Sequence, residues 1–303
     1  MTLHPSAPPN HLAPDELRVR PGADGVALAI DPARAGWRYL SFRARAVEAQ
    51  ERIDVGGSGT ETCVVVLSGG GVVLEVGSDR LELAGRATVF DGKPWACYVP
   101  DGCHAHLSAA PSGGAKQVVV AIAEAPSSGR SGVASAPVLI RPENVDVEIR
   151  GAGNATRRIH HIIKPEFPAD RLEVVEVFTP AGNWSSWPPH KHDVDDMPRE
   201  AVLEEIYYYQ LRRPEGWGIQ RLYRREGDRR DGVWAVRHGE LVLVTDGYHP
   251  FAAAHGYDAY YLNALAGDRR TMACTDDPDL AWTRAAWAEQ SVDPRAAALV
   301  HEA

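Results

Sequence analysis

Short stretches of apolar or alternating residues run along most of this chain, and turns rich in Gly, Pro and Asp separate them. Stretches of this length and spacing are typical of β-strands. In the first half the pattern predicts strands at residues 37–46, 62–68, 71–76, 80–83, 87–90, 96–99, 105–109 and 117–123. In the second half it predicts strands at 145–149, 172–179, 187–192, 206–210, 218–223, 233–237, 241–244, 249–253 and 258–265. The tail, 278–300, instead has helical spacing.

The two halves follow the same plan. Each has a strand, a hairpin, a strand that begins after Gly, and then an Asp-Gly turn, at Asp101-Gly102 in one half and Asp246-Gly247 in the other. Residues 125–137 between them are rich in Ser, Gly, Ala and Pro, as linkers often are. We therefore expect an all-β fold of two antiparallel jelly-roll barrels, residues 1–135 and 136–303, with a short C-terminal helix.

Composition narrows the classes of partner. The chain has 303 residues and a net charge of −9, without a basic stripe, so we expect no nucleic-acid partner. No apolar run reaches the roughly 18 residues of a membrane-spanning helix, and the N-terminus lacks the apolar region of a signal peptide. The four cysteines, Cys63, Cys97, Cys103 and Cys274, form no CxxC pair. We expect reduced thiols and a cytoplasmic protein.

Histidine and glutamate in the second half indicate a metal site. His190 and His192 lie two residues apart on a predicted strand, so their side chains share one face. Glu205 begins a later strand, and His249 follows an Asp-Gly turn. Separately, each has an ordinary explanation, because an H-x-H pair is common and a charged residue often sits at a strand end. Together they predict a centre for one divalent transition metal: Mn, Fe, Zn, Co or Ni.

The order of these residues resembles the cupin superfamily, in which a Gly, an H-x-H pair and a Glu are followed by a second motif ending in His. Here the motifs read Gly182…His190-Lys191-His192…Glu205 and Gly239…Thr245-Asp246-Gly247-Tyr248-His249. The gap between His192 and Glu205 is longer than is usual in cupins, which predicts an inserted loop, 193–203, at the pocket mouth. Glu204 is the alternative carboxylate ligand; the aromatic residues that follow favour Glu205.

The first half lacks this ligand set. Gly56-Gly57-Ser58-Gly59 stands where the H-x-H pair belongs, so we expect the first barrel to be structural and free of metal. His104 and His106 form another H-x-H pair, which we expect at the surface.

Longer strings narrow the resemblance to one bicupin family. Gly36-Trp-Arg-Tyr-Leu-Ser-Phe42, Gly182-Asn-Trp-Ser-Ser-Trp-Pro-Pro-His-Lys-His-Asp193 and Gly256-Tyr-Asp-Ala-Tyr-Tyr-Leu-Asn263 are similar to the 5-deoxy-glucuronate isomerases of inositol catabolism. These are related to 4-deoxy-L-threo-5-hexosulose-uronate ketol-isomerase. The resemblance implies conversion of 5-deoxy-D-glucuronate, an aldose, to the ketose 2-deoxy-5-keto-D-gluconate. It also implies a small deoxy-uronate as partner, and we expect a homo-oligomer.

Aldose–ketose isomerisation suggests roles for further residues. A divalent ion can act as a Lewis acid on two adjacent sugar oxygens. A metal-bound water or hydroxide, or Glu204, could then move the proton, and a hydride shift is the rival path. Arg221 is our candidate for the substrate carboxylate, although it could face outward on its strand, and Gln220 for the hydroxyls. Tyr261 could line the pocket or fill the core.

Two other functions are compatible with this sequence. A cupin dioxygenase has the same three-His, one-Glu centre with iron, and fold does not fix function. A non-catalytic sugar-sensing or storage bicupin would bind a sugar acid without turnover. The complete ligand set favours the isomerase over both.

Overall fold

The computed structural model describes residues 14–110, 117–227 and 229–300. Nearly all regular structure is β, and all the strand pairs are antiparallel. The helices are short: α1 (Pro32–Ala35) near the start, α2 (Trp282–Ala285) near the end, and a few 3₁₀ turns. No helix in the described ranges is long and apolar enough to cross a membrane.

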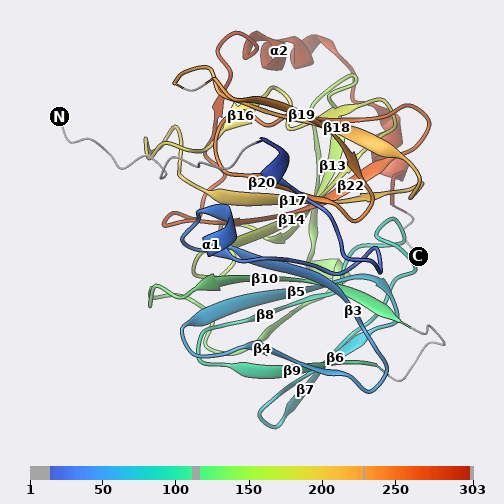
Figure 1. Cartoon of the computed structure of the whole chain (residues 1–303), viewed down its shortest axis with the longest axis vertical. Coiled ribbons are helices and arrows are strands. Elements are labelled where there is room, and N and C mark those ends of the chain that lie inside the picture. The colour runs from blue at the N-terminus through green and yellow to red at the C-terminus, as the bar shows by residue number, and fades with distance from the viewer. Residues whose placement is uncertain (1–13, 111–116, 228, 301–303) are drawn as a thin grey trace.

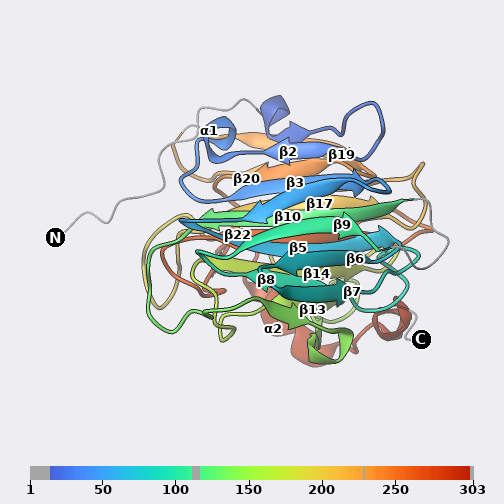
Figure 2. The same cartoon turned by 90° about the horizontal axis from the view of Figure 1, so that it is seen from below.

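The first half folds from two sheets. The six-stranded sheet has the order β11 (Val138–Ile140), β8 (Ala96–Val99), β5 (Thr60–Gly69), β10 (Val118–Pro126), β3 (Ser41–Val47), β2 (Leu28–Ile30). A four-stranded sheet faces it, with the order β4 (Arg52–Gly56), β9 (His104–Ala109), β6 (Val72–Val76), β7 (Asp79–Leu83). Figure 2 shows β2, β3, β10, β5 and β8 side by side in this order.

The second half repeats the design. Its seven-stranded sheet has the order β1 (Arg18–Val19), β20 (Leu241–Val244), β17 (Glu204–Leu211), β22 (Ala259–Ala266), β14 (Leu172–Thr179), β13 (Arg157–Ile163), β12 (Asp146–Arg150). The facing sheet has the order β15 (Trp184–Ser185), β21 (Phe251–Ala253), β18 (Trp217–Tyr223), β19 (Asp231–Arg237). A two-stranded ribbon pairs β16 (His190–Lys191) with β23 (Thr275–Asp276).

The two large sheets lie against each other in the middle of the molecule (Figure 1). Phe42 and Tyr208 meet across this interface with ring centroids 5.6 Å apart, and Phe90 and Phe178 meet at 5.9 Å. Arg86 of the first half also reaches the fully buried carboxylate of Glu176 on β14. Because breaking a buried ion pair leaves an uncompensated charge, this contact ties the two halves tightly together.

The predicted boundary between residues 135 and 136 stays a prediction, and two short strands do not follow it. β1 joins the sheet of the second half through β20, and β11 joins the sheet of the first half through β8. Each half thus contributes one edge strand to the sheet of the other half. These strands cover backbone groups that would otherwise be exposed at a sheet edge.

The local predictions of strands were largely right, with three exceptions that matter. Residues 87–90 form no strand; they make a turn in which the Thr88 hydroxyl bonds to Asp91. β4 and β13 were not predicted, because charged and histidine residues interrupt their apolar pattern. β13 has consequences for function, since one of its faces lines the cavity described below.

Candidate metal centre

Three separate segments carry the predicted ligands to one end of the second barrel. His190 begins β16, and His192 follows that strand after Lys191. Lys191 points away, because its ammonium group bonds to Asp193 and Glu200. Alternation along an extended chain therefore directs both histidines to the same side.

Glu205 and His249 come from the neighbouring sheet and its connecting turn. Glu205 lies on β17, opposite Val244 of β20. The turn that leads to His249 needs a glycine at position 247, where φ is +80° and a Cβ atom would lie 2.5 Å from the carbonyl oxygen of Tyr223. Only glycine adopts this backbone so close to another strand without strain.

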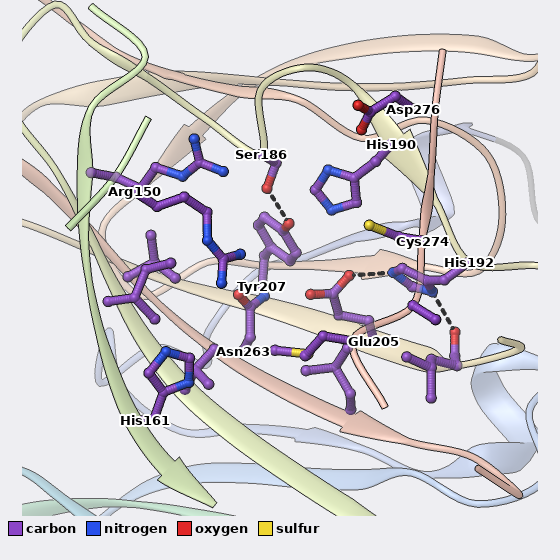
Figure 3. A pocket seen from close by; sticks show the side chains of 18 of the residues that line it. Arg150, His161, Ser186, His190, His192, Glu205, Tyr207, Asn263, Cys274 and Asp276 are labelled. Carbon is purple, nitrogen blue, oxygen red and sulfur yellow. Dashed lines mark hydrogen bonds and ion pairs between the residues drawn. The ribbon is translucent and has the colours of Figure 1, made fainter. Parts of the chain in front are cut away.

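The ligand atoms of three of these residues cluster closely. His192 Nε2 lies 2.9 Å from Glu205 Oε2, and His249 Nε2 lies 3.3 Å from the same oxygen. The ring of His190 lies 4.7 Å from that of His249, centroid to centroid, but outside the tightest group. Figure 3 shows His190, His192 and Glu205 on one side of the cavity. The structure thus brings all four predicted ligands together.

Backbone carbonyls fix the orientation of all three imidazole rings. The Nδ1 atoms of His190, His192 and His249 lie 3.2, 3.0 and 2.9 Å from the carbonyl oxygens of Pro188, Leu203 and Gly247. Because a carbonyl can only accept, each Nδ1 must donate its proton. The Nε2 atoms of His190 and His249 are then left with lone pairs, as metal-ligating histidines require, whereas Nε2 of His192 faces the Glu205 carboxylate.

Electrostatics and burial also fit a metal ion. Burial, together with the neighbouring histidines, lowers the pKa of His190 and of His249 to about 3, so both rings are neutral at physiological pH. Burial opposes the charged form of His192 too, but the hydrogen bond and charge of Glu205 outweigh it and raise its pKa. Among the described residues, no hydrogen-bond donor reaches His249 Nε2, a buried acceptor that faces the Glu205 carboxylate. Such an orphan is costly unless something binds it, and three nitrogens with one carboxylate suit a divalent transition metal.

A cavity of about 590 Å³ opens beside this cluster. It is large enough for a small sugar acid. Its polar walls include Arg150, Arg157, His161, Ser186, Tyr207, Asn263, Asp276 and Arg284, and its apolar walls include Ile159, Val175, Val177 and Leu265. Pro198, Arg199 and Leu203 also line it, which confirms that the inserted loop 193–203 reaches the pocket.

Comparison with known proteins shows the family of this chain. Residues 15–283 match the model of the KduI/IolB family. A 5-deoxy-glucuronate isomerase of Geobacillus thermodenitrificans is 40% identical over 265 residues, or 86% of this chain and 92% of that protein. One from Listeria monocytogenes is 36% identical over 269 residues, or 86% of this chain and 93% of that protein. The chain belongs to the KduI/IolB family.

Solved structures place this KduI/IolB chain among the bicupins. A crystal structure of an IolB-like protein from Salmonella typhimurium is 33% identical and covers 88% of this chain and 98% of its own, with a TM-score of 0.81. A mutant of Bacillus subtilis oxalate decarboxylase, at 9% identity and a TM-score of 0.56 over 82% of this chain and 74% of its own, shares the fold. The predicted all-β bicupin fold with a short C-terminal helix is confirmed.

Two residues that we predicted to be catalytic do not reach the cavity of this family member. The carboxylate of Glu204 points away from Glu205 and accepts hydrogen bonds from the backbone N–H groups of Arg38, Tyr39 and Leu40. Arg221 binds both carboxylate oxygens of Asp231 at 2.8 and 2.7 Å on the outer face of β18. Glu204 is thus held by the N-terminal segment and Arg221 by an ion pair. The predicted catalytic role of neither residue agrees with its position in the structure.

The two remaining candidates differ. Gln220 is fully buried behind the site, where its amide donates to the carbonyl oxygen of His249 at 3.0 Å and its oxygen accepts from Tyr209. It therefore positions the turn of His249 and does not contact substrate. Tyr261 does line the cavity, stacked on Tyr207 with centroids 4.5 Å apart.

Other polar residues that line this cavity were not predicted from the sequence as site residues. Arg157 and His161 lie on β13, the strand that was not predicted, and Ser186, Asp276 and Arg284 come from loops and short elements. The β-branched residues of β13, Ile159, Ile162 and Ile163, were the signal that could have revealed this strand.

A second group of metal-binding side chains lies on the first half. Asp54 of β4 stands beside His104 and His106 of β9, and Asp54 Oδ1 lies 2.5 Å from His106 Nδ1. His104 and Asp54 are exposed, as predicted for the surface H-x-H pair. An exposed group of this kind lacks the enclosing cavity of the first site.

Proposed function

We propose that this protein isomerises 5-deoxy-D-glucuronate to 2-deoxy-5-keto-D-gluconate in the catabolism of myo-inositol, with a divalent transition metal held by His190, His192, Glu205 and His249. The observation that carries the proposal is the buried donor cluster inside a sugar-sized cavity, with one imidazole nitrogen left unpaired. The 5-deoxy-glucuronate isomerases among its relatives support the choice of substrate.

The reaction needs no external oxidant or reductant. In the numbering of the substrate, one hydrogen leaves C2 and one arrives at C1, and the proton of the C2 hydroxyl moves to the C1 oxygen. The C2 hydroxyl carbon thus becomes the ketone, which is C5 of the product, and the C1 aldehyde becomes an alcohol. A bound divalent ion would supply Lewis acidity to the sugar oxygens next to these carbons. Three histidines and one carboxylate leave coordination positions open for those oxygens.

The residues around the cluster orient the sugar. The hydroxyl of Tyr207 is hydrogen-bonded to that of Ser186, and Tyr261 lies 3.5 Å from the same serine oxygen. These hydroxyls can donate to or accept from sugar hydroxyl groups. The apolar side chains of Val175 and Val177 on β14 and of Leu265 on β22 also line the cavity. Because Glu204 lies elsewhere, any base that moves the C2 proton is water-derived or belongs to the cavity wall.

Oxygen dependence separates this proposal from the dioxygenase alternative. Purified protein should convert 5-deoxy-D-glucuronate to the 5-keto product at the same rate with oxygen present and with oxygen removed, as followed by carbon NMR. His249→Ala should abolish the conversion. His104→Ala, which removes a surface histidine of the first half, is the matched control and should keep full rate. Loss of activity on removing oxygen, with an oxidised product in air, would contradict the proposal.

A further inference from the structure

The wall of the cavity carries an unusual concentration of positive charge. Four arginines line it: Arg150, Arg157, Arg199 and Arg284. Three of them have a carboxylate partner in the structure: Arg150 with Glu148, Arg199 with Asp196, and Arg284 with Asp276. The fourth, Arg157, is the most buried, with 4% of its surface exposed. Among the residues that the structure describes, Arg157 forms no ion pair with a carboxylate.

The contacts of Arg157 leave one edge of its guanidinium group open. Nη1 donates to the carbonyl oxygens of Ala155 and Trp187, both at 3.1 Å. The group also lies 5.5 Å from the ring of Trp287. Within the described chain, Nε and Nη2 have no hydrogen-bond partner. These two nitrogens form the edge that binds a carboxylate with two parallel hydrogen bonds. The carbonyl contacts hold that edge in a fixed position.

Arg150, the neighbour of Arg157 on the adjacent strand, makes the positive charge of Arg157 more unfavourable. Arg150 on β12 stands directly opposite Arg157 on β13, and like charges at such a position destabilise a sheet. Arg150 is held by both oxygens of Glu148 at 2.7 and 2.8 Å. Burial, and then the charge of Arg150, lower the pKa of Arg157 to about 10. A buried charge without a counter-ion is costly, and an anionic ligand would remove that cost.

We propose that Arg157 binds the carboxylate of the substrate through Nε and Nη2 and is the residue by which the enzyme selects a uronate over a neutral sugar. This inference rests on the proposed function and adds the orientation of the substrate. Arg150, its partner across the strands, lies on the opposite side of the cavity from His192 (Figure 3). The carboxylate end of the sugar therefore lies at β13, and the aldehyde end lies at the histidine cluster.

A pair of substrates that differ only in charge tests this role. Wild type, Arg157→Met and Arg157→Lys are each assayed with 5-deoxy-D-glucuronate and with its neutral amide. Loss of a charge-assisted contact should lower kcat/KM for the uronate by roughly 10- to 100-fold in Arg157→Met. The amide should be converted within about threefold of the wild-type rate, because it never used the ion pair. Arg157→Lys keeps the positive charge but cannot form two parallel hydrogen bonds. Its kcat/KM for the uronate should lie between those of wild type and Arg157→Met.

Controls separate an anchoring role from a structural one. Arg221→Met removes an arginine outside the cavity and should preserve the preference for the uronate. Metal content should stay unchanged in every variant. Equal losses on the uronate and the amide would show that Arg157 only supports the fold, and they would overturn the proposal. A wild-type enzyme without preference for the uronate would overturn it as well.

The same question can be asked without turnover. Calorimetric titration of EDTA-treated protein with D-glucuronate and D-glucuronamide compares the two ligands directly. If wild type binds the acid more tightly than the amide and Arg157→Met does not, the role of Arg157 in carboxylate binding is supported. That conclusion holds even if 5-deoxy-D-glucuronate is not converted, a result that would reject only the proposed reaction. Equal binding of both ligands by wild type rejects the anchor itself.

Discussion

Glu173 should make this protein less stable as the pH rises, and the effect can be worked out from its surroundings. It lies on β14 with 1% of its surface exposed, and neither carboxyl oxygen has a hydrogen bond of good geometry in the described residues; the backbone N–H of Thr271 favours the charged form but does not outweigh burial. Arg270, the cation with the largest effect on this carboxyl, donates to the backbone carbonyls of Lys164, Phe167, Ala169 and Leu172 instead. Burial raises the pKa of Glu173 from 4.5 to about 7.

The sign follows from comparing the folded and unfolded states. Below pH 4.5 the carboxyl is neutral in both states and ionisation has no effect. Between pH 4.5 and about 7 the unfolded state ionises Glu173 in water while the folded state keeps it neutral. Stability present at low pH is therefore lost across this window, and the loss levels off above pH 7. Since one pKa unit corresponds to about 1.4 kcal/mol, the loss amounts to about 3 kcal/mol once the pH is well above 7.

Glu173→Gln isolates this effect, because glutamine has nearly the same shape and cannot ionise. Urea unfolding, followed by tryptophan fluorescence with EDTA present, would give the free energy of unfolding at pH 5 and pH 8. The difference between wild type and variant should change by about 2 to 3 kcal/mol between these values, in favour of the variant at pH 8. Glu82→Gln replaces an exposed glutamate and should show no such change. An identical pH dependence in wild type and Glu173→Gln would refute the reasoning.

Three further substitutions test the assignment of the site. His249→Ala should lose its bound metal, as measured by elemental analysis, while circular dichroism keeps its β signal; retained metal would refute the ligand assignment. Glu204→Ala should lower the free energy of unfolding by about 1–3 kcal/mol, because three backbone N–H groups lose their acceptor, and kcat should stay within about twofold. Arg221→Ala removes a half-exposed ion pair worth about 0–1 kcal/mol, so steady-state rates should be unchanged; a large loss of kcat in either would return that residue to the mechanism.

Local pattern, together with the resemblance to cupins, led to the predicted ligand cluster. The alternation of side chains places His190 and His192 on one face and Lys191 on the other, and it separates Glu205 from Glu204 in the same way. The same rule argues against one of our own pairs of assignments. Gln220 and Arg221 are adjacent on β18, so they could not both face the substrate.

The carboxylate end of the cavity depends on information that lies far apart in the sequence. Arg157 faces the cavity because β13 pairs with β12 on one side and with β14 on the other. Its position opposite Arg150 is set by that register, and the backbone carbonyl of Trp187 comes from another segment. A local pattern of apolar residues contains none of these strand pairings. For this reason Arg221, which is exposed in the structure, was predicted to bind the substrate carboxylate instead of Arg157.

The most direct test of the metal-dependent isomerase is proton NMR of the purified protein with 5-deoxy-D-glucuronate in D₂O, before and after treatment with EDTA. The aldehyde signal should disappear as the keto product forms, the reaction should stop after EDTA, and added divalent metal should restore it. Deuterium at the product carbon that derives from the aldehyde carbon would indicate proton transfer, and its absence would indicate a hydride shift or a shielded proton. Conversion that continues undiminished in metal-free protein, or no conversion with metal present, would contradict the account.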